Sequence, residues 1–256
     1  MKKVTAFVGS GRKRHTYEAA GQFLSNLQAM GDIEVELVRL SDYRIQTCQG
    51  CQTCFRRGEE HCPLKDDRDV LIAKMMASDG VVFASPNYSF QVSAMLKAFL
   101  DRLGFAFHRP RFFGKTFTSI VAQGIYGGDK IVDYLDFVGN GLGFNTVKGV
   151  CLETIDPVTE KQQQKIDRVL AAHARRFYLS TQRPAYPAPT LFKLMLFRFG
   201  RTSIRLELND GWRDYTYYTE QGWLKSDYYY PTRLGPLMQG AGKLFDSLSA
   251  RLAAAR

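Results

Sequence analysis

Long hydrophobic runs are missing from this sequence. No apolar segment approaches the roughly 20 residues that a membrane-spanning helix requires, so we expect no transmembrane segment. Behind Met1-Lys2-Lys3, the apolar run ends at Gly9 and polar residues follow, which does not fit a signal peptide. These two absences predict a cytoplasmic protein.

Two familiar phosphate-binding motifs are also absent. The G-x-G-x-x-G pattern of dinucleotide-binding folds fails because Gly9 and Gly11 are followed by Arg14 where the third glycine would stand. The G-x-x-x-x-G-K-S/T pattern of nucleoside triphosphatases does not occur. The sequence therefore argues against both classes of protein.

A basic arm and a nucleic-acid-binding motif are missing as well, although the chain carries a net charge of +10. Its 35 lysines and arginines are spread along the whole length. We therefore expect no nucleic-acid partner, and we interpret the charge as a surface that attracts phosphorylated cofactors or acidic partners.

The stretch from Val4 to Thr16 contains the pattern of a strand, a loop and a helix start. Val4–Val8 is apolar, β-branched and aromatic, as a strand buried on both faces should be, and glycines follow it. Thr16 is a candidate N-cap for the next helix. A helix N-terminus with hydroxyls and cations around it suits a phosphate, although a turn with a basic rim has the same composition.

Further along the chain, apolar runs alternate with helical patterns. Strands are expected at 4–8, 33–40, 80–85, 115–122 and 146–151, and the intervening helices end with a long one over 159–181. This alternation predicts an α/β fold with a doubly wound, five-stranded parallel sheet. Ligands of such sheets bind beyond the carboxyl ends of the strands, so the loops at 9–16, 85–93 and 122–128 should converge on one site.

Three motifs on these loops carry a family resemblance. They are Gly9-Ser10-Gly11-Arg12, then Ser85-Pro86-Asn87-Tyr88-Ser89 with the helix Leu96–Arg102 behind it, and Ala122-Gln123-Gly124. Over roughly residues 1–181 the chain resembles the NADPH-dependent FMN reductase family of flavodoxin-like proteins. The resemblance implies an FMN cofactor, NAD(P)H as the electron donor, and a homodimer or higher homo-oligomer.

The resemblance also implies roles for individual residues. The phosphate of FMN would lie on the first loop, the ribityl chain and one ring edge on the second, and the other side of the ring on the third. Backbone amides of 87–89 or 123–124 would stabilise the anionic reduced flavin. No catalytic side chain is expected, because a flavin performs its own redox chemistry. The implied cofactor-binding residues are Ser10, Arg12, His15, Thr16, Pro86, Asn87, Tyr88, Ser89, Gln123 and Gly124.

Four of the five cysteines lie between positions 48 and 62. Cys48, Cys51 and Cys54 follow a Cys-x2-Cys-x2-Cys spacing, which places three thiolates in one tight loop, and Cys62 can supply a fourth. The arrangement resembles the cluster motif of the iron-sulfur flavoproteins, a branch of the same family, and implies a 4Fe-4S cluster. Two alternatives are thiols without a metal, which can oxidise to a disulfide, and a zinc site.

The composition changes near Arg183, so we expect a first domain over 1–182 and a C-terminal extension over 183–256. Three prolines introduce the extension, followed by an apolar segment with arginines, a cluster of aromatic residues over 212–230 and an amphipathic pattern from Leu237 onward. It could form a lid, a dimer contact, a partner-docking surface or simply its own aromatic core.

Three functions are compatible with these features. The leading one is an FMN-dependent NAD(P)H oxidoreductase that reduces a small acceptor such as a quinone, a flavin or a metal. The second is an iron-sulfur flavoprotein that transfers electrons between ferredoxin-like carriers and an acceptor through FMN and the cluster. The third is a flavin-binding module without enzymatic activity.

Overall fold

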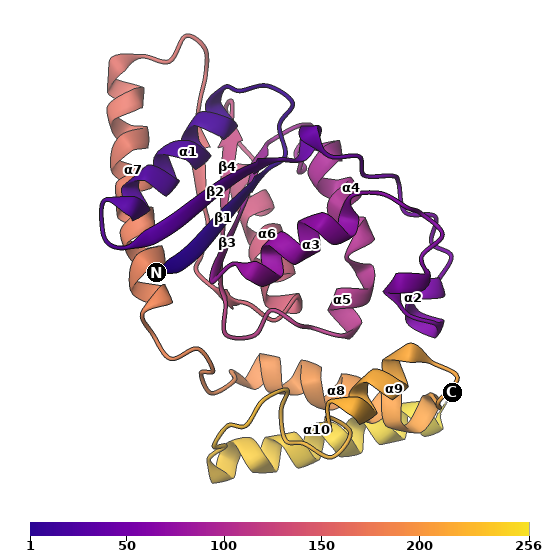
Figure 1. Ribbon diagram of the computed structural model, residues 1–256. Helices are drawn as coiled ribbons and strands as arrows, with labels where there is room; N and C mark the ends of the chain where they lie inside the picture. The colour runs from indigo at the N-terminus through magenta and orange to yellow at the C-terminus, as the bar shows by residue number, and fades with distance from the viewer. Residues whose placement is uncertain (256) are drawn as a thin grey trace. The chain divides into compact units, whose positions relative to one another are not determined.

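A computed structural model describes residues 1–255 of the chain, which form two compact units (Figure 1). The first unit contains Met1–Cys48, Leu64–Gly104 and Pro110–Ala185. The second contains Gln49–Pro63, Phe105–Arg109 and the chain from Tyr186 onward. Among the described residues, no helix combines the length and the apolar character needed to cross a membrane.

The first unit is built on a parallel sheet in the order β2-β1-β3-β4-β5, with β6 also paired to β4. This order confirms the flavodoxin-like, doubly wound α/β fold. Its strands are β1 (Lys2–Val8), β2 (Ile33–Arg39), β3 (Gly80–Pro86), β4 (Thr116–Gln123), β5 (Asn145–Thr146) and β6 (Val150–Glu153).

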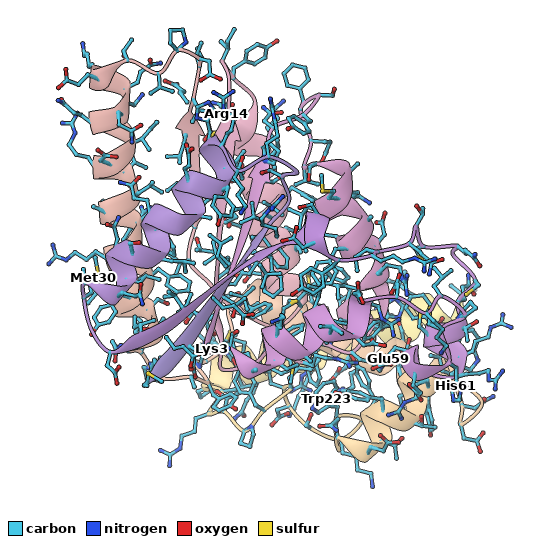
Figure 2. All side chains as sticks on the ribbon, turned by 45° about the horizontal axis from the view of Figure 1, so that its top comes forward. Lys3, Arg14, Met30, Glu59, His61 and Trp223 are labelled. Atoms are coloured by element: carbon cyan, nitrogen blue, oxygen red, sulfur yellow. The ribbon has the colours of Figure 1, made fainter. Side chains whose placement is uncertain are left out.

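Helices cover both faces of this sheet. Figure 1 shows α1 and α7 on one face, with α3, α4 and α6 on the other. Figure 2 places Arg14 at the start of α1 and Met30 just beyond its end. The helical elements of the unit are α1 (His15–Gln28), η1 (Leu40–Asp42), α3 (Arg68–Ala77), α4 (Ala94–Arg102), α6 (Gly128–Gly141) and α7 (Glu160–Thr181).

Alternation along the strands divides the core into two layers. On β1, Val4, Ala6 and Val8 join the cluster beneath α1 and α7, which includes Phe23 and Phe177. The other layer is aromatic, because Phe7, Phe83 and Phe117 meet there with ring centroids 5.2 to 5.8 Å apart. These layers hold the carboxyl ends of the central strands at one edge of the sheet.

The fifth strand, expected as one run over 146–151, is two short pieces. Gly149 lies between them, and a Cβ there would be 2.0 Å from the Ser119 Oγ. The Gly149 amide donates to Asp136 Oδ1 at 3.2 Å, so it does not bond to a neighbouring strand. The close approach to Ser119 and the bond to a carboxylate therefore interrupt the strand.

The second unit consists of helices around a small aromatic core. Tyr218, Trp223, Tyr228 and Tyr229 form edge-to-face contacts with centroids 4.8 to 5.2 Å apart, and Phe197 packs on Tyr229 at 4.5 Å. Its helical elements are α2 (Thr53–Arg56), η2 (Glu59–His61), α5 (Gly104–His108), α8 (Leu191–Glu207), α9 (Arg213–Glu220) and α10 (Pro236–Ala254).

Buried Arg109 explains why this unit includes two pieces of chain from before residue 182. Its guanidinium donates to the Cys54 carbonyl at 2.9 Å, to Glu59 at 2.7 Å and to Asp214. The cysteine-bearing loop and the start of α9 are therefore joined through one cation. Sequence reasoning placed 49–63 and 105–109 with the first domain because ion pairs between distant residues leave no local pattern.

Candidate functional site

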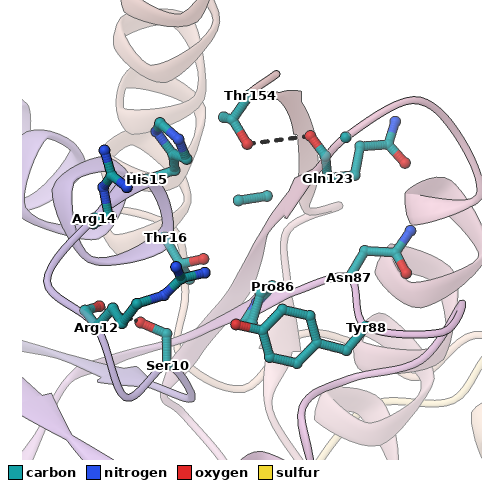
Figure 3. A pocket seen from close by; sticks show the side chains of 12 residues that line it. Ser10, Arg12, Arg14, His15, Thr16, Pro86, Asn87, Tyr88, Gln123 and Thr154 are labelled. Carbon is teal, nitrogen blue, oxygen red and sulfur yellow. Dashed lines mark hydrogen bonds between the residues drawn. The ribbon is translucent and has the colours of Figure 1, made fainter. Parts of the chain in front are cut away.

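A pocket lies at the carboxyl edge of the sheet, where the loops after β1, β3 and β4 meet (Figure 3). Its volume is about 150 Å³. Figure 3 shows Arg12, Arg14 and His15 on one side of it and Asn87 and Tyr88 on the other. The residues lining the pocket are Ser10, Arg12, Arg14, His15, Thr16, Pro86, Asn87, Tyr88, Ala122, Gln123, Gly124 and Thr154.

The first loop is held close to the sheet by a glycine. A Cβ at Gly9 would lie 2.8 Å from the Ser93 Oγ, so a larger residue would push the loop away from α4. The Ser10 hydroxyl donates to the Arg12 carbonyl at 2.7 Å, and Arg39 donates to the Gly11 carbonyl at 3.0 Å. These bonds fix the loop that leads into α1.

Helix α1 begins at His15 with Arg14 as its N-cap, so the expected capping role of Thr16 is wrong. Thr16 lies inside the first turn and is buried. Arg14 has no side chain oxygen to accept from the first-turn amides, and within residues 1–255 no side chain caps this end. The Tyr17 and Glu18 amides donate to the Arg14 carbonyl, so the amides before them and the positive end of the helix dipole remain for a ligand at the pocket.

Cations surround this helix end. Arg12 and Arg14 are exposed and line the pocket, whereas Lys13 between them lies over the Tyr17 ring. His15 Nε2 is 3.0 Å from Asp156 Oδ1. The hydrogen bond from His15 lowers the pKa of the Asp156 carboxyl, and Arg14 and Arg12 act in the same direction. His15 thus contacts the loop after β6 as well as the pocket.

The second loop uses several of its amides internally. The Asn87 amide donates to the Ala122 carbonyl at 2.8 Å, and the Tyr88 amide donates to the Gln91 carbonyl at 3.0 Å. Of the backbone donors expected to face a reduced flavin on this loop, these two are therefore already bonded. Ser89 occupies the tip of the turn with φ of 50° and lies outside the lining residues, while Tyr88 is half exposed at the rim.

The third loop is anchored by Gln123. Its Oε1 accepts from the Gly128 amide at 2.7 Å. Its carbonyl accepts from the Thr154 amide at 2.8 Å and from the Thr154 hydroxyl at 3.1 Å (Figure 3). Gln123 thus shapes the wall of the pocket through its own backbone and the start of α6. Gly124 follows it with open space where a Cβ would be.

All the expected cofactor-binding residues except Ser89 line the pocket. Sequence reasoning missed Arg14, Ala122 and Thr154. Arg14 belongs to the cations expected around the helix start, but it was not among the residues that the family resemblance implied. Thr154 directly follows β6, and the rule that ligands bind at the carboxyl ends of strands could have identified it.

The residues of the pocket fit a phosphorylated, flexible ligand. Guanidinium groups and an uncapped helix N-terminus bind phosphate oxygens, and Ser10 and Thr16 add hydroxyls. A volume of about 150 Å³ is below the roughly 300–1,000 Å³ of pockets that enclose a whole drug-sized ligand. The pocket therefore suits a phosphate and the chain attached to it, with a ring against the rim at Tyr88.

The cysteines lie in a loop that forms little regular structure. Residues 44–52, which include Cys48 and Cys51, form no helix or strand. Cys48 and Cys51 are exposed, and Cys54 and Cys62 are half-buried. Within residues 1–255, no three His, Cys, Asp or Glu side chains gather closely enough to hold a metal ion. Four thiols are suitable ligands for an iron-sulfur cluster, and holding one requires this loop to close around it.

Cys151 differs from these four. It is half-buried at β6, and burial raises the pKa of its thiol to about 12. A thiol with such a pKa stays protonated at neutral pH and is a poor nucleophile.

Comparisons with known proteins identify the family of this chain. The model of the family described as NADPH-dependent FMN reductase matches residues 2–154. An iron-sulfur flavoprotein of Archaeoglobus fulgidus is 32% identical over 186 residues, which cover 68% of this chain and 82% of that protein. An iron-sulfur flavoprotein of Clostridioides difficile is 26% identical over 175 residues, covering 65% and 75% of the two chains.

Solved structures share the fold at low sequence identity. RosB, crystallised with the bound intermediate 8-demethyl-8-formylriboflavin-5'-phosphate, has a TM-score of 0.60 at 15% identity and covers 82% of this chain and 89% of its own. The NAD(P)H:quinone oxidoreductase from Methanothermobacter marburgensis has a TM-score of 0.54 at 15% identity, over 68% and 98% of the two chains. The family match spans more than half of the sequence and includes all three pocket loops, so this chain belongs to the NADPH-dependent FMN reductase family.

Proposed function

We propose that this chain is an oxidoreductase that binds FMN in the pocket at the carboxyl edge of the sheet. One observation carries this proposal. The uncapped N-terminus of α1, Arg12 and Arg14 all lie at one pocket, and the loops after β3 and β4 line the same pocket. In this arrangement the first loop binds the phosphate of FMN. The walls at Pro86 and Thr154 border the ribityl chain, and Tyr88, Asn87 and Gly124 border the ring.

The bound FMN supplies the hydride and electron chemistry. The residues of the chain bind and orient it. Arg12 and Arg14 contribute charge-assisted hydrogen bonds to the phosphate, and the half-exposed Tyr88 offers an aromatic face at the rim. The amides of Ser89 and Gly124 are the remaining candidates from the second and third loops for stabilising charge on a reduced ring.

We further propose NAD(P)H as the hydride donor and a small molecule such as a quinone, a flavin or a metal as the acceptor. The description of the family supports the nicotinamide donor, and the open rim of the pocket supports a small acceptor. We also propose a cytoplasmic location, a homodimer or higher homo-oligomer, and a functional division near residue 182. Sedimentation of the FMN-loaded chain tests the oligomeric state.

The binding mode is tested by comparing two flavins and three variants. Arg12→Gln and Arg14→Gln should each weaken FMN binding about tenfold, the value of one exposed charge-assisted hydrogen bond. Lys13→Gln is the matched control, because Lys13 lies in the same loop but outside the pocket. Riboflavin lacks the phosphate and should bind all three variants as it binds the wild type. Fluorescence quenching measures each affinity, and an equal loss for both flavins would contradict the assignment of the loop.

A second function is favoured by the cysteine spacing and by the relatives named iron-sulfur flavoproteins. We propose that Cys48, Cys51, Cys54 and Cys62 hold a 4Fe-4S cluster, so that electrons pass between a ferredoxin-like carrier and an acceptor. The donor set suits such a cluster, since thiolates are its usual ligands.

Anaerobic purification followed by iron and acid-labile sulfide assays tests this second function. Near-equal iron and sulfide, lost in Cys51→Ala but kept in the control Cys151→Ala, would support it. Flavin bands without iron, even after reconstitution, would contradict the iron-sulfur function and leave the NAD(P)H-dependent reductase, which turnover with NAD(P)H would distinguish from a flavin-binding module without activity. A chain that binds no FMN under any of these conditions would contradict both functions.

A further inference from the structure

A second cavity, of about 330 Å³, lies within the second unit. This volume is in the range of small-molecule sites in proteins. None of its residues belongs to the flavin pocket. The lining residues are Gln52, Phe55, His108, Ser203, Ile204, Glu207, Leu208, Trp212 and Asp214.

Aromatic rings form much of the wall. Phe55 and His108 are stacked, with ring centroids 4.3 Å apart and an interplanar angle of 27°. The Arg56 guanidinium lies 5.2 Å from the Trp212 ring centroid and holds the indole by a cation–π contact. Rings in such walls offer flat ligands both area and favourable offset stacking.

His108 supplies a directed polar group in this wall. Its Nδ1 is 2.8 Å from Asp214 Oδ2, and Asp214 is itself buried and paired with Arg109. Because a carboxylate only accepts hydrogen bonds, Nδ1 is the donor, and in the singly protonated ring Nε2 is an acceptor. In the part of the chain that the structure describes, no side chain or backbone group bonds to this Nε2, and half of the His108 side chain is exposed.

Gln52 adds an independent sign of a built site. This residue lines the cavity and has φ of 59°, the left-handed conformation that non-glycine residues rarely adopt. Such conformations cost free energy, and they persist mainly where a site or a clamp requires the backbone to take that path.

We propose that this cavity binds a neutral, planar aromatic molecule that carries a phenolic hydroxyl. The hydroxyl donates a hydrogen bond to His108 Nε2, and the ring lies against Phe55 and Trp212. Glu207 and Asp214 line the same cavity, and no lysine or arginine is among the lining residues, which favours a neutral ligand over an anionic one. This site does not depend on the proposed flavin function, since the two pockets share no residue.

Calorimetry with the full-length, FMN-saturated chain tests the proposal, using 1-naphthol and 1-methoxynaphthalene as probes. The methoxy compound has the same ring but no hydroxyl donor, so it should bind about 5-fold more weakly, as expected for one lost hydrogen bond. His108→Phe keeps a ring on Phe55 but lacks the acceptor, and should bind both probes equally. His61→Phe is the matched control, because His61 belongs to the same unit and lies outside the cavity.

Two further measurements guard against a variant that fails to fold. Ile204→Trp should fill the cavity and abolish 1-naphthol binding while its circular dichroism stays that of the wild type. In the wild-type chain, the imidazole 15N shift of His108 Nε2 should move when 1-naphthol is added. Three results would overturn the proposal. The first is 1-naphthol binding that is unchanged in both His108→Phe and Ile204→Trp. The others are an Nε2 shift that does not change when 1-naphthol is added, and no binding of 1-naphthol to the wild type.

Discussion

His173 is fully buried in the first unit, where its Nε2 lies 3.0 Å from the Thr118 Oγ1. Burial lowers the pKa of its imidazole to about 3, and Arg176 acts in the same direction. The ring is therefore neutral in the folded chain at any physiological pH. It packs in the core of the first unit and does not line the pocket at the carboxyl edge of the sheet.

The pKa of His173 predicts loss of stability in acid. The unfolded chain, with a histidine pKa near 6.5, binds a proton that the folded chain excludes down to about pH 3. The free energy of unfolding should thus fall by about 2 kcal/mol from about pH 7 to about pH 5 through this group. Urea unfolding followed by circular dichroism measures the effect, and His173→Gln should lack it.

The pH dependence of stability must be compared between the wild type and His173→Gln, because Asp136 also contributes to it. Burial raises the pKa of its carboxyl to about 6, so this group favours the folded chain as the pH falls through that value. Its contribution partly offsets that of His173 in the wild type but is present in both proteins. The difference between wild type and His173→Gln isolates the histidine, and equal pH slopes would contradict its assignment.

Among individual residues, the sequence predicted which ones line the pocket at the carboxyl edge of the sheet better than it predicted the contacts that each one makes. Glycines, cations and the residues after β3 followed from motif and topology. Two hydrogen bonds could not be predicted from the sequence: the one from the Gly128 amide to Gln123 and the one from the Asn87 amide to the Ala122 carbonyl. Both depend on the relative positions of separate loops. The choice of Arg14 over Thr16 as the N-cap likewise rests on the path of the preceding loop.

Among the helices, α6 packs against β4 at a position that admits only glycine. A Cβ at Gly139 would lie 2.3 Å from the Phe117 ring, which is fully buried between Phe83 and Phe144. Gly139→Ala should therefore destabilise the first unit by about 1–3 kcal/mol, although alanine is the better helix former. Denaturant unfolding measures the change.

Gly240 on α10 is the control for this prediction. It has open space where a Cβ would be, so Gly240→Ala should stabilise its helix by about 0.5–1 kcal/mol. Similar effects of the two substitutions would mean that helix propensity, and not the contact with Phe117, decides the outcome at Gly139.

The junction of α5, the cysteine-bearing loop and α9 depends on Arg109. Removing its charge leaves Asp214 buried without its main partner, so Arg109→Met should cost about 3–5 kcal/mol. Tryptophan fluorescence is a suitable probe, because Trp212 and Trp223 both belong to the second unit. Arg56→Met, which removes only the contact with Trp212, should cost less than about 1 kcal/mol. Equal losses in the free energy of unfolding for Arg109→Met and Arg56→Met would contradict the role of Arg109 in joining these segments.

The elements themselves were largely predictable. The sequence patterns predicted the long helix over 159–181, which is α7, and the strand over 33–40, which is β2. The split of the fifth strand was not predictable, since it arises from the contact of Gly149 with Ser119 and Asp136 across the fold. Local pattern decides the existence of an element, and packing decides where it is interrupted.

For the whole molecule, the net charge of +10 should govern how fast FMN arrives. A positive surface attracts the phosphate dianion over distances near the Debye length. The association rate of FMN should therefore fall about 3- to 10-fold as salt rises from about 0.02 M to about 0.3 M, while that of riboflavin stays constant. Stopped-flow fluorescence measures both rates, and an equal fall for both flavins would exclude electrostatic steering.

The three-part composition of the second unit has a consequence for synthesis of the chain. Residues 49–63 are made early, but Asp214, which completes the surroundings of Arg109, follows roughly 150 residues after them. At ordinary translation rates this delay lasts about 10 to 30 s. The cysteine-bearing loop is therefore open to cellular thiols and metal ions for much of translation, and it reaches its final surroundings only after α9 has left the ribosome.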